Sequence, residues 1–119
     1  MYIVRVEDSF AAAHFLTHYH GKCERLHGHN YRVRVYARGT ELDEGGMLLD
    51  FGVLKAALHE VLGAFDHSLL NDEPSFMGDP SAERIAALIF ARLAERLPGA
   101  PLHAVEVFET EKNMARFEP

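Results

Sequence analysis

Residues 30–38 alternate between two kinds of side chain, and this regular alternation constrains the fold more than any other feature. Successive side chains of an extended strand point to opposite faces, so the alternation predicts a half-buried β-strand. One face of the predicted strand is apolar, and the other carries three arginines. The apolar set is Tyr31, Val33, Val35 and Ala37, and the opposite set is Arg32, Arg34, Tyr36 and Arg38.

Two histidines extend the apolar face of this strand toward the N-terminus. His27 and His29 share its parity and would emerge on one face, where two imidazoles can bind the same metal ion. Residues 2–10 also alternate, and if that strand continues through residues 11–14, His14 falls on its apolar parity as well. Three histidines with an exchangeable fourth position are typical of catalytic zinc. The pattern therefore predicts a zinc site.

Two amphipathic helices and two more strands follow. Asp50 is the predicted N-cap of the first helix, and Ser81 is the predicted N-cap of a second helix that reaches about Leu97. Alternation over residues 104–110 predicts a third strand, and residues 114–117 form a short fourth one. The order ββααββ indicates an α+β fold, with an antiparallel four-stranded sheet and both helices on one face.

Composition limits the class of protein. The 119 residues fit a single domain spanning 1–119. A net charge of −6 argues against nucleic acid or an anionic membrane as partner, although a small anionic substrate needs only local positive charge. The single cysteine excludes an internal disulfide. With no signal-peptide pattern at the N-terminus and no membrane-spanning apolar run, we expect a cytoplasmic protein.

The predicted sheet has one face that no helix covers. On the second strand this face carries three arginines and a tyrosine, so it is not simply apolar. Burial against another subunit and the lining of a polar tunnel are both compatible with such a surface. We therefore expect a homo-oligomer, although periodicity does not give the number of subunits.

Cys23, the only cysteine, has three possible roles. It could be a fourth zinc ligand, a thiolate nucleophile or base beside the metal, or an inert packed side chain. Two good amphipathic helices do not need zinc in order to fold, which favours the second role. Positive charge from the metal, Lys22 or Arg25 would help to form the thiolate.

Two carboxylates elsewhere are further candidates for the site. Asp66 directly precedes His67, and such a pair can act as an acid–base dyad, although spacing alone favours an ordinary turn pair. Glu109 falls on the apolar parity of the third strand, and a buried carboxylate needs a partner. That partner is either a cation or a ligand with paired N–H donors, such as a guanidine-like ring edge.

Six motifs together resemble the 6-pyruvoyl-tetrahydropterin synthases and their bacterial relatives. The resemblance runs from near the N-terminus to near the C-terminus. The three residues between Cys23 and His27 resemble the 6-carboxy-tetrahydropterin synthase branch of queuosine biosynthesis, since the pyruvoyl-forming branch usually has a longer gap. A folate-linked branch has glutamate in place of this cysteine. The motifs are residues 10–14, 23–31, 49–51, 66–71, 80–83 and 108–110.

The resemblance implies a fold, an assembly and a set of site residues. The fold is the tunnelling fold, in which trimers close their sheets into a barrel and two trimers stack into a hexamer. Arg84 departs from the family pattern, because many relatives carry asparagine there, and this weakens the transfer of roles around the start of the second helix. The implied roles are zinc ligation by His14, His27 and His29, base catalysis by Cys23 with the dyad Asp66 and His67, and pterin binding by Glu109, Ser81 and Glu83.

The resemblance also implies a reaction. The substrate would be 7,8-dihydroneopterin triphosphate, and the products 6-carboxy-tetrahydropterin, acetaldehyde and triphosphate. Lys22, Arg25 and Lys112 are unranked candidates for holding the triphosphate. Two alternatives are the pyruvoyl-forming synthase, which eliminates triphosphate without carbon–carbon cleavage, and a non-catalytic zinc-stabilised binding module.

Overall fold

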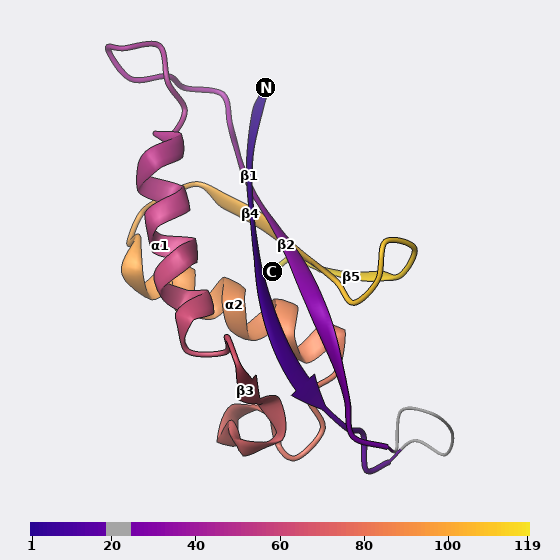
Figure 1. Ribbon diagram of the computed structural model, residues 1–119. Helices are drawn as coiled ribbons and strands as arrows, with labels where there is room; N and C mark the ends of the chain where they lie inside the picture. Colours follow the sequence, from indigo (N-terminus) through magenta and orange to yellow (C-terminus); the bar gives the residue numbers. More distant parts are fainter. Residues whose placement is uncertain (19–24) are drawn as a thin grey trace.

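A five-stranded sheet with two α-helices on one face makes up the described part of the protein (Figure 1). The computed structural model describes residues 1–18 and 25–119. Within these residues, no helix is long and apolar enough to cross a membrane. The elements are β1 (Tyr2–His14), β2 (His27–Gly39), α1 (Phe51–Gly63), β3 (Ser68–Leu69), the 3₁₀ turns η2 (Leu70–Asp72) and η3 (Pro74–Phe76), α2 (Ala82–Arg96), β4 (Leu102–Phe108) and β5 (Met114–Phe117).

The strand order is β3-β1-β2-β4-β5, and the α+β prediction is confirmed. The four predicted strands are antiparallel neighbours, whereas β3 pairs in parallel with β1 at Ala12 and Ala13. The sequence analysis did not predict β3, because a strand of two residues is too short to show a period. The sheet is therefore mixed.

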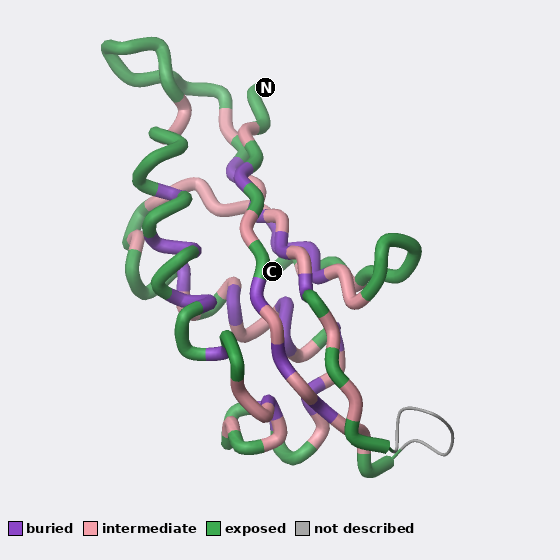
Figure 2. The backbone as a smooth tube through the Cα atoms, in the orientation of Figure 1, coloured by how far each residue is buried: buried purple, intermediate pink, exposed green. Residues whose placement is uncertain are grey.

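β1 and β2 pair without a break from Tyr2 opposite Gly39 to His14 opposite His27. The first strand does continue to His14, and from Val4 to His14 every second residue is the more buried one. His14 lies on the buried parity and is only 1% exposed. Figure 2 shows this alternation as buried residues interspersed with partly buried ones along the long hairpin.

Both predicted helix starts are confirmed. The Asp50 carboxylate accepts a hydrogen bond of 2.7 Å from the Gly52 N–H, and the Ser81 hydroxyl accepts one of 3.2 Å from the Arg84 N–H. Each helix turns its apolar stripe toward the sheet, where the core lies. The second helix ends at Arg96, close to the predicted end. The stripes are Leu54, Ala57, Leu58, Val61 and Leu62 in α1, and Ala82, Ile85, Ala86, Ile89 and Leu93 in α2.

The face of the sheet away from the helices carries a cluster around one buried carboxylate. Glu106 is 7% exposed and accepts hydrogen bonds from the Tyr36 hydroxyl at 2.7 Å and from Arg116 Nη1 at 2.9 Å. The Arg116 guanidinium also lies 4.8 Å from the centroid of the Tyr36 ring. The polar face predicted from the sequence is therefore internally paired at β4 and β5.

Removal of this carboxylate should destabilise the sheet. Glu106→Ala leaves the Tyr36 hydroxyl and the Arg116 guanidinium without their acceptor, and we expect the free energy of unfolding to fall by about 2 kcal/mol. Glu118→Ala is the matched control, because it removes the exposed carboxylate that Arg116 Nε contacts at 2.8 Å. Urea unfolding should separate the two variants, and equal midpoints would contradict the assignment.

Candidate metal centre and substrate pocket

Three histidines meet where β1 ends and β2 begins. His14 and His27 are directly paired across the two strands, and His29 follows on the same face of β2. One ring nitrogen from each histidine lies within 4.8 Å of the others, so the group could hold a metal ion. The unbroken register of the hairpin, predicted from the alternation, brings the three side chains together.

Hydrogen bonds on the outer side of two rings fix their orientation. His14 Nδ1 lies 2.9 Å from the Pro80 carbonyl oxygen, and His27 Nδ1 lies 2.7 Å from that of Arg25. A carbonyl oxygen only accepts, so each Nδ1 carries the proton and each Nε2 keeps its lone pair. Such outer hydrogen bonds are the usual way in which proteins orient histidine ligands.

The inward-facing nitrogens suit a cation. His14 Nε2 and His27 Nε2 lie 3.0 Å apart, and in the tautomers just described both present lone pairs to each other. His29 Nε2 is buried and has no hydrogen-bond partner among the described residues. A cation bound between these nitrogens removes the lone-pair repulsion and satisfies the buried atom. An all-imidazole donor set is one that Zn²⁺ favours.

Burial favours the metal-binding form of two of the three histidines. Desolvation lowers the pKa of His14 and of His29, and the Glu109 carboxylate opposes this shift in both. The net shift is downward for each histidine, so the neutral form is favoured at pH 7. Neutral imidazole is the form that binds a metal ion.

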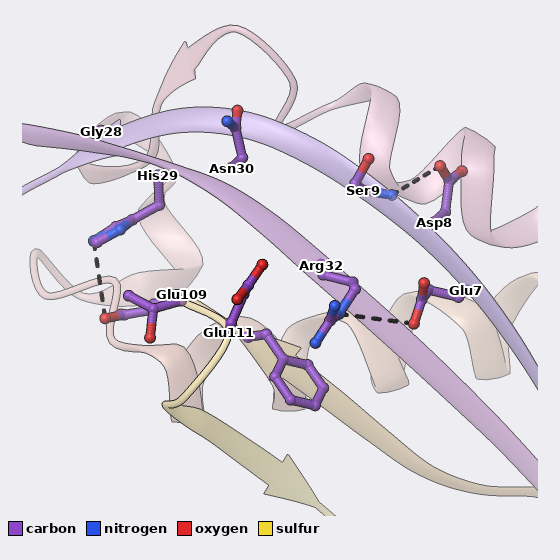
Figure 3. A pocket seen from close by; sticks show the side chains of 11 residues that line it. Glu7, Asp8, Ser9, Gly28, His29, Asn30, Arg32, Glu109 and Glu111 are labelled. Atoms are coloured by element: carbon purple, nitrogen blue, oxygen red, sulfur yellow. Dashed lines mark hydrogen bonds and ion pairs between the residues drawn. The ribbon is translucent and has the colours of Figure 1, made fainter.

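Glu109 faces the triad from just beyond the end of β4. Its carboxylate oxygens lie 3.9 Å from His14 Nε2 and 3.9 Å from His29 Nε2. Figure 3 shows the contact with His29. β4 ends at Phe108, so Glu109 lies outside the strand that was predicted to contain it. Its backbone N–H instead donates to the Asn113 carbonyl at 3.2 Å, in the turn toward β5.

Two hollows adjoin Glu109. A hollow of about 260 Å³ is lined by Glu109, Ser81 and Glu83, which are the three predicted pterin-binding residues. A larger hollow of about 760 Å³ lies on the other side and is lined by Glu109, His29 and Arg32 among others (Figure 3). Glu109 therefore lines both spaces that a substrate could enter, and His29 lines the larger one with it.

Asp66 and His67 face each other, as the dyad prediction requires. Asp66 Oδ2 lies 2.9 Å from His67 Nδ1, and Asp66 Oδ1 accepts the Ala11 N–H at 2.9 Å. These contacts, the Ala11 bond first, lower the pKa of Asp66. His67 adopts a left-handed backbone conformation with φ of 57°, which few non-glycine residues do outside functional or strained positions.

The dyad is not part of the histidine group. The His67 side chain is 82% exposed, and it shares with His29 the lining of a shallow hollow of about 590 Å³. The predicted catalytic Cys23 lies outside the described residues, as does Lys22. The structure thus brings together His14, His27, His29 and Glu109, and it places the dyad beside Ala11 of β1.

Sequence reasoning missed two residues that hold the chain just after His14. Asn71 accepts the Phe15 N–H at 3.0 Å and donates to the Phe15 carbonyl at 2.9 Å. Asp79 accepts the Thr17 N–H at 2.5 Å and the Thr17 hydroxyl at 2.8 Å. An Asp between glycine and proline ordinarily indicates only a turn, so nothing in the sequence pointed to a partner 62 residues away.

The profile of the family described as 6-pyruvoyl tetrahydropterin synthase matches residues 3–119. The chain therefore belongs to this family. A 6-carboxy-5,6,7,8-tetrahydropterin synthase of Synechocystis is 48% identical, over 98% of this chain and 93% of the relative. A human 6-pyruvoyl tetrahydrobiopterin synthase is 33% identical, over 82% and 71%. The solved structure of a Caenorhabditis elegans 6-pyruvoyl tetrahydropterin synthase superimposes with a TM-score of 0.86 at 32% identity, covering 100% of this chain and 97% of that one.

The lowered pKa of His14 predicts how stability depends on pH without metal. An unfolded histidine titrates near pH 6.5, and the buried His14 binds a proton less readily than that. Protonation thus favours the unfolded chain, and stability should fall as the pH drops below about 6.5. In His14→Asn the side-chain amide N–H can still donate to Pro80 but does not titrate.

The measurement is urea unfolding with a chelator present, at pH 7.5 and at pH 5.5. We expect the midpoint of the wild type to fall more steeply with pH than that of His14→Asn. Equal slopes for the two proteins would contradict the assignment of a depressed pKa to His14.

Proposed function

We propose that this protein is a zinc-dependent 6-carboxy-5,6,7,8-tetrahydropterin synthase. It converts 7,8-dihydroneopterin triphosphate into 6-carboxy-tetrahydropterin, acetaldehyde and triphosphate, as a step of 7-deazaguanine and queuosine biosynthesis. The observation that supports this most is the convergence of three imidazole nitrogens in a chain 48% identical to a relative of that name. We assign the protein as a lyase because this reaction breaks a carbon–oxygen bond, which releases triphosphate, and a carbon–carbon bond, which releases acetaldehyde.

His14, His27 and His29 are the proposed zinc ligands. Zinc bound there supplies a Lewis acid for the oxygens of the substrate side chain. The carbonyl oxygens of Pro80 and Arg25 hold two of the rings in the metal-binding tautomer. The orientation of these two rings is thus set by the protein's own hydrogen bonds, independently of the metal.

Glu109 is the proposed anchor for the pterin ring. A carboxylate has two acceptor oxygens and can bind the paired N–H groups of a guanidine-like edge. Ser81 and Glu83 line the same hollow and are the proposed flanking contacts. The 3.9 Å approach of Glu109 to two histidines also permits a second reading, in which this carboxylate is itself a metal ligand.

Cys23, Asp66 and His67 are the proposed proton-transfer residues. The thiolate of Cys23 would take a proton from the substrate side chain, and His67 would act as the partner acid or base. The Asp66 carboxylate lies 2.9 Å from His67 Nδ1 and orients the His67 ring. Because the His67 side chain is largely exposed, the dyad is accessible to a substrate.

A cytoplasmic homo-hexamer, built as two stacked trimers, is the proposed state of the protein. Among the described strands, β1 pairs with β3 only at Ala12 and Ala13, so most of that edge has no partner strand. β5 lies at the opposite edge of the sheet. Unpaired edges can join between subunits, which supports the closure of three sheets into a barrel.

Product analysis tests the proposed reaction. Zinc-loaded protein incubated with 7,8-dihydroneopterin triphosphate should release acetaldehyde together with triphosphate. Triphosphate release with a pyruvoyl product and no acetaldehyde would instead identify the pyruvoyl-forming alternative. The 33% identical human relative is named for that reaction, so this alternative has its own support.

Cys23→Ala separates an enzyme from a zinc-stabilised binding module. If Cys23 is the base, the variant should keep its zinc, because the three histidines remain, and turnover should be lost. If Cys23 is the fourth ligand of a closed structural site, zinc content should fall with the substitution. Zinc analysis of the purified variant, alongside the turnover assay, distinguishes these outcomes.

Glu109→Gln distinguishes the two readings of that carboxylate. As a pterin anchor, its loss should lower kcat/KM by roughly 10- to 100-fold, since a hydrogen bond to a charged group contributes about 1.5–3 kcal/mol. The variant should still bind one zinc ion per chain. Loss of zinc from Glu109→Gln would identify the carboxylate as a ligand and overturn the anchor assignment.

A further inference from the structure

We propose that Arg84 is a positioning residue for the metal centre. It holds the turn over residues 76–80 in the one conformation in which the Pro80 carbonyl oxygen accepts from His14 Nδ1. This inference rests on the proposed zinc site.

Arg84 contacts the turn at both ends. Its Nη1 donates to the Phe76 carbonyl oxygen at 2.7 Å and to the Asp79 carbonyl oxygen at 3.3 Å. Its backbone is fixed as well, because its N–H donates to the Ser81 hydroxyl in the first turn of α2. One side chain therefore links the start of the turn, the end of the turn and the helix that follows.

The turn depends on such hydrogen bonds because its backbone is unfavourable. Met77 has φ of 53° and Gly78 has φ of 88°, so two successive residues lie in the left-handed region. This region costs free energy for a residue with a side chain, and Met77 is 72% exposed, so packing does not compensate. Hydrogen bonds to the turn carbonyls, from Arg84 and from Asn71 to Gly78 at 3.1 Å, oppose relaxation of the turn.

The conformation of the turn over residues 76–80 also determines the position of His14, the first of the proposed zinc ligands. Pro80 directly follows Asp79, whose carbonyl oxygen Arg84 holds, and the Pro80 carbonyl oxygen lies 2.9 Å from His14 Nδ1. His14 is almost fully buried, so a displaced carbonyl could not be replaced by solvent without rearrangement. Hydrogen-bond partners of this kind fix the tautomer and ring orientation of a metal-binding histidine.

The direction in which zinc affinity changes when Arg84 is replaced separates a positioning role from a purely electrostatic one. Removal of a positive charge near a cation site should strengthen binding of the cation, because a repulsive interaction is lost. Loss of the orienting contact should weaken it. A weaker zinc affinity in an Arg84 variant therefore cannot come from the charge change alone.

The experiment is a zinc titration of the purified, metal-free protein in competition with a chromophoric chelator. We expect Arg84→Ala to bind zinc about tenfold more weakly than the wild type, at the lower end of the range for residues that support a metal ligand. With Co²⁺ in place of zinc, the visible absorption bands should shift, since they report ligand geometry. Neither measurement depends on turnover.

Arg92→Ala is the matched control. Arg92 lies on the same helix and carries the same charge, and its guanidinium donates to Glu73 Oε1 at 2.7 Å. Among the described residues, it makes no hydrogen bond or ion pair to the turn over residues 76–80. Its zinc affinity and Co²⁺ spectrum should match those of the wild type. If both variants bind zinc equally weakly, the effect comes from lost helix stability and the proposal fails.

Two further outcomes are informative. Arg84→Ala with wild-type or tighter zinc affinity and an unchanged Co²⁺ spectrum would overturn the positioning role while leaving the zinc site intact. A wild-type protein that binds neither metal would instead overturn the proposed zinc site itself. Should Arg84→Ala fail to fold, Arg84→Met decides, because methionine favours a helix and keeps an unbranched side chain but has no donor for the two carbonyl oxygens, and wild-type affinity in that variant would refute the proposal.

Discussion

The unbroken pairing of β1 with β2 is the constraint on which the rest of the structure depends. A slip of one residue in a β-ladder moves every side chain to the opposite face. Here such a slip would move His14 out of the core and away from His27 and His29. It would also expose the apolar face that packs against α1 and α2. The hydrophobic alternation that makes the hairpin fold in register therefore also brings the three candidate metal ligands together.

The candidate metal centre joins the two layers of the fold. His14 belongs to the sheet, and its outward hydrogen bond reaches the Pro80 carbonyl at the entrance to α2. Asn71 and Asp79 add hydrogen bonds between the same loop and the residues just after His14. The ligand geometry thus depends on a segment far away in sequence, so a change at the start of α2 can alter the site without touching a ligand.

Local patterns in the sequence were enough to predict both α-helices, the four longer strands and the three histidines that meet in the candidate metal centre. The period of residues 30–38 set the faces of β2, and the caps Asp50 and Ser81 marked both helices. Single-sequence reasoning failed where a long-range hydrogen bond decides the conformation, as at Asp79, and where an element is too short to show a period, as in β3. It also placed Glu109 inside a strand, because parity does not reveal where the ladder stops.

The charges around the larger hollow bear on how a triphosphate could be bound. Its lining includes four carboxylates, and Arg32 is the lone lysine or arginine among the lining residues that the structure describes. Arg32 is itself close to one of those carboxylates, with its Nε 3.8 Å from Glu7. The four carboxylates repel a triphosphate, and Glu7 already offsets part of the Arg32 charge, so this wall alone cannot neutralise a triphosphate. The neutralising charge must come from a bound metal ion, from other basic residues of the chain or from a neighbouring subunit, and the last source would make assembly a requirement for substrate binding. The carboxylates concerned are those of Glu7, Asp8, Glu109 and Glu111.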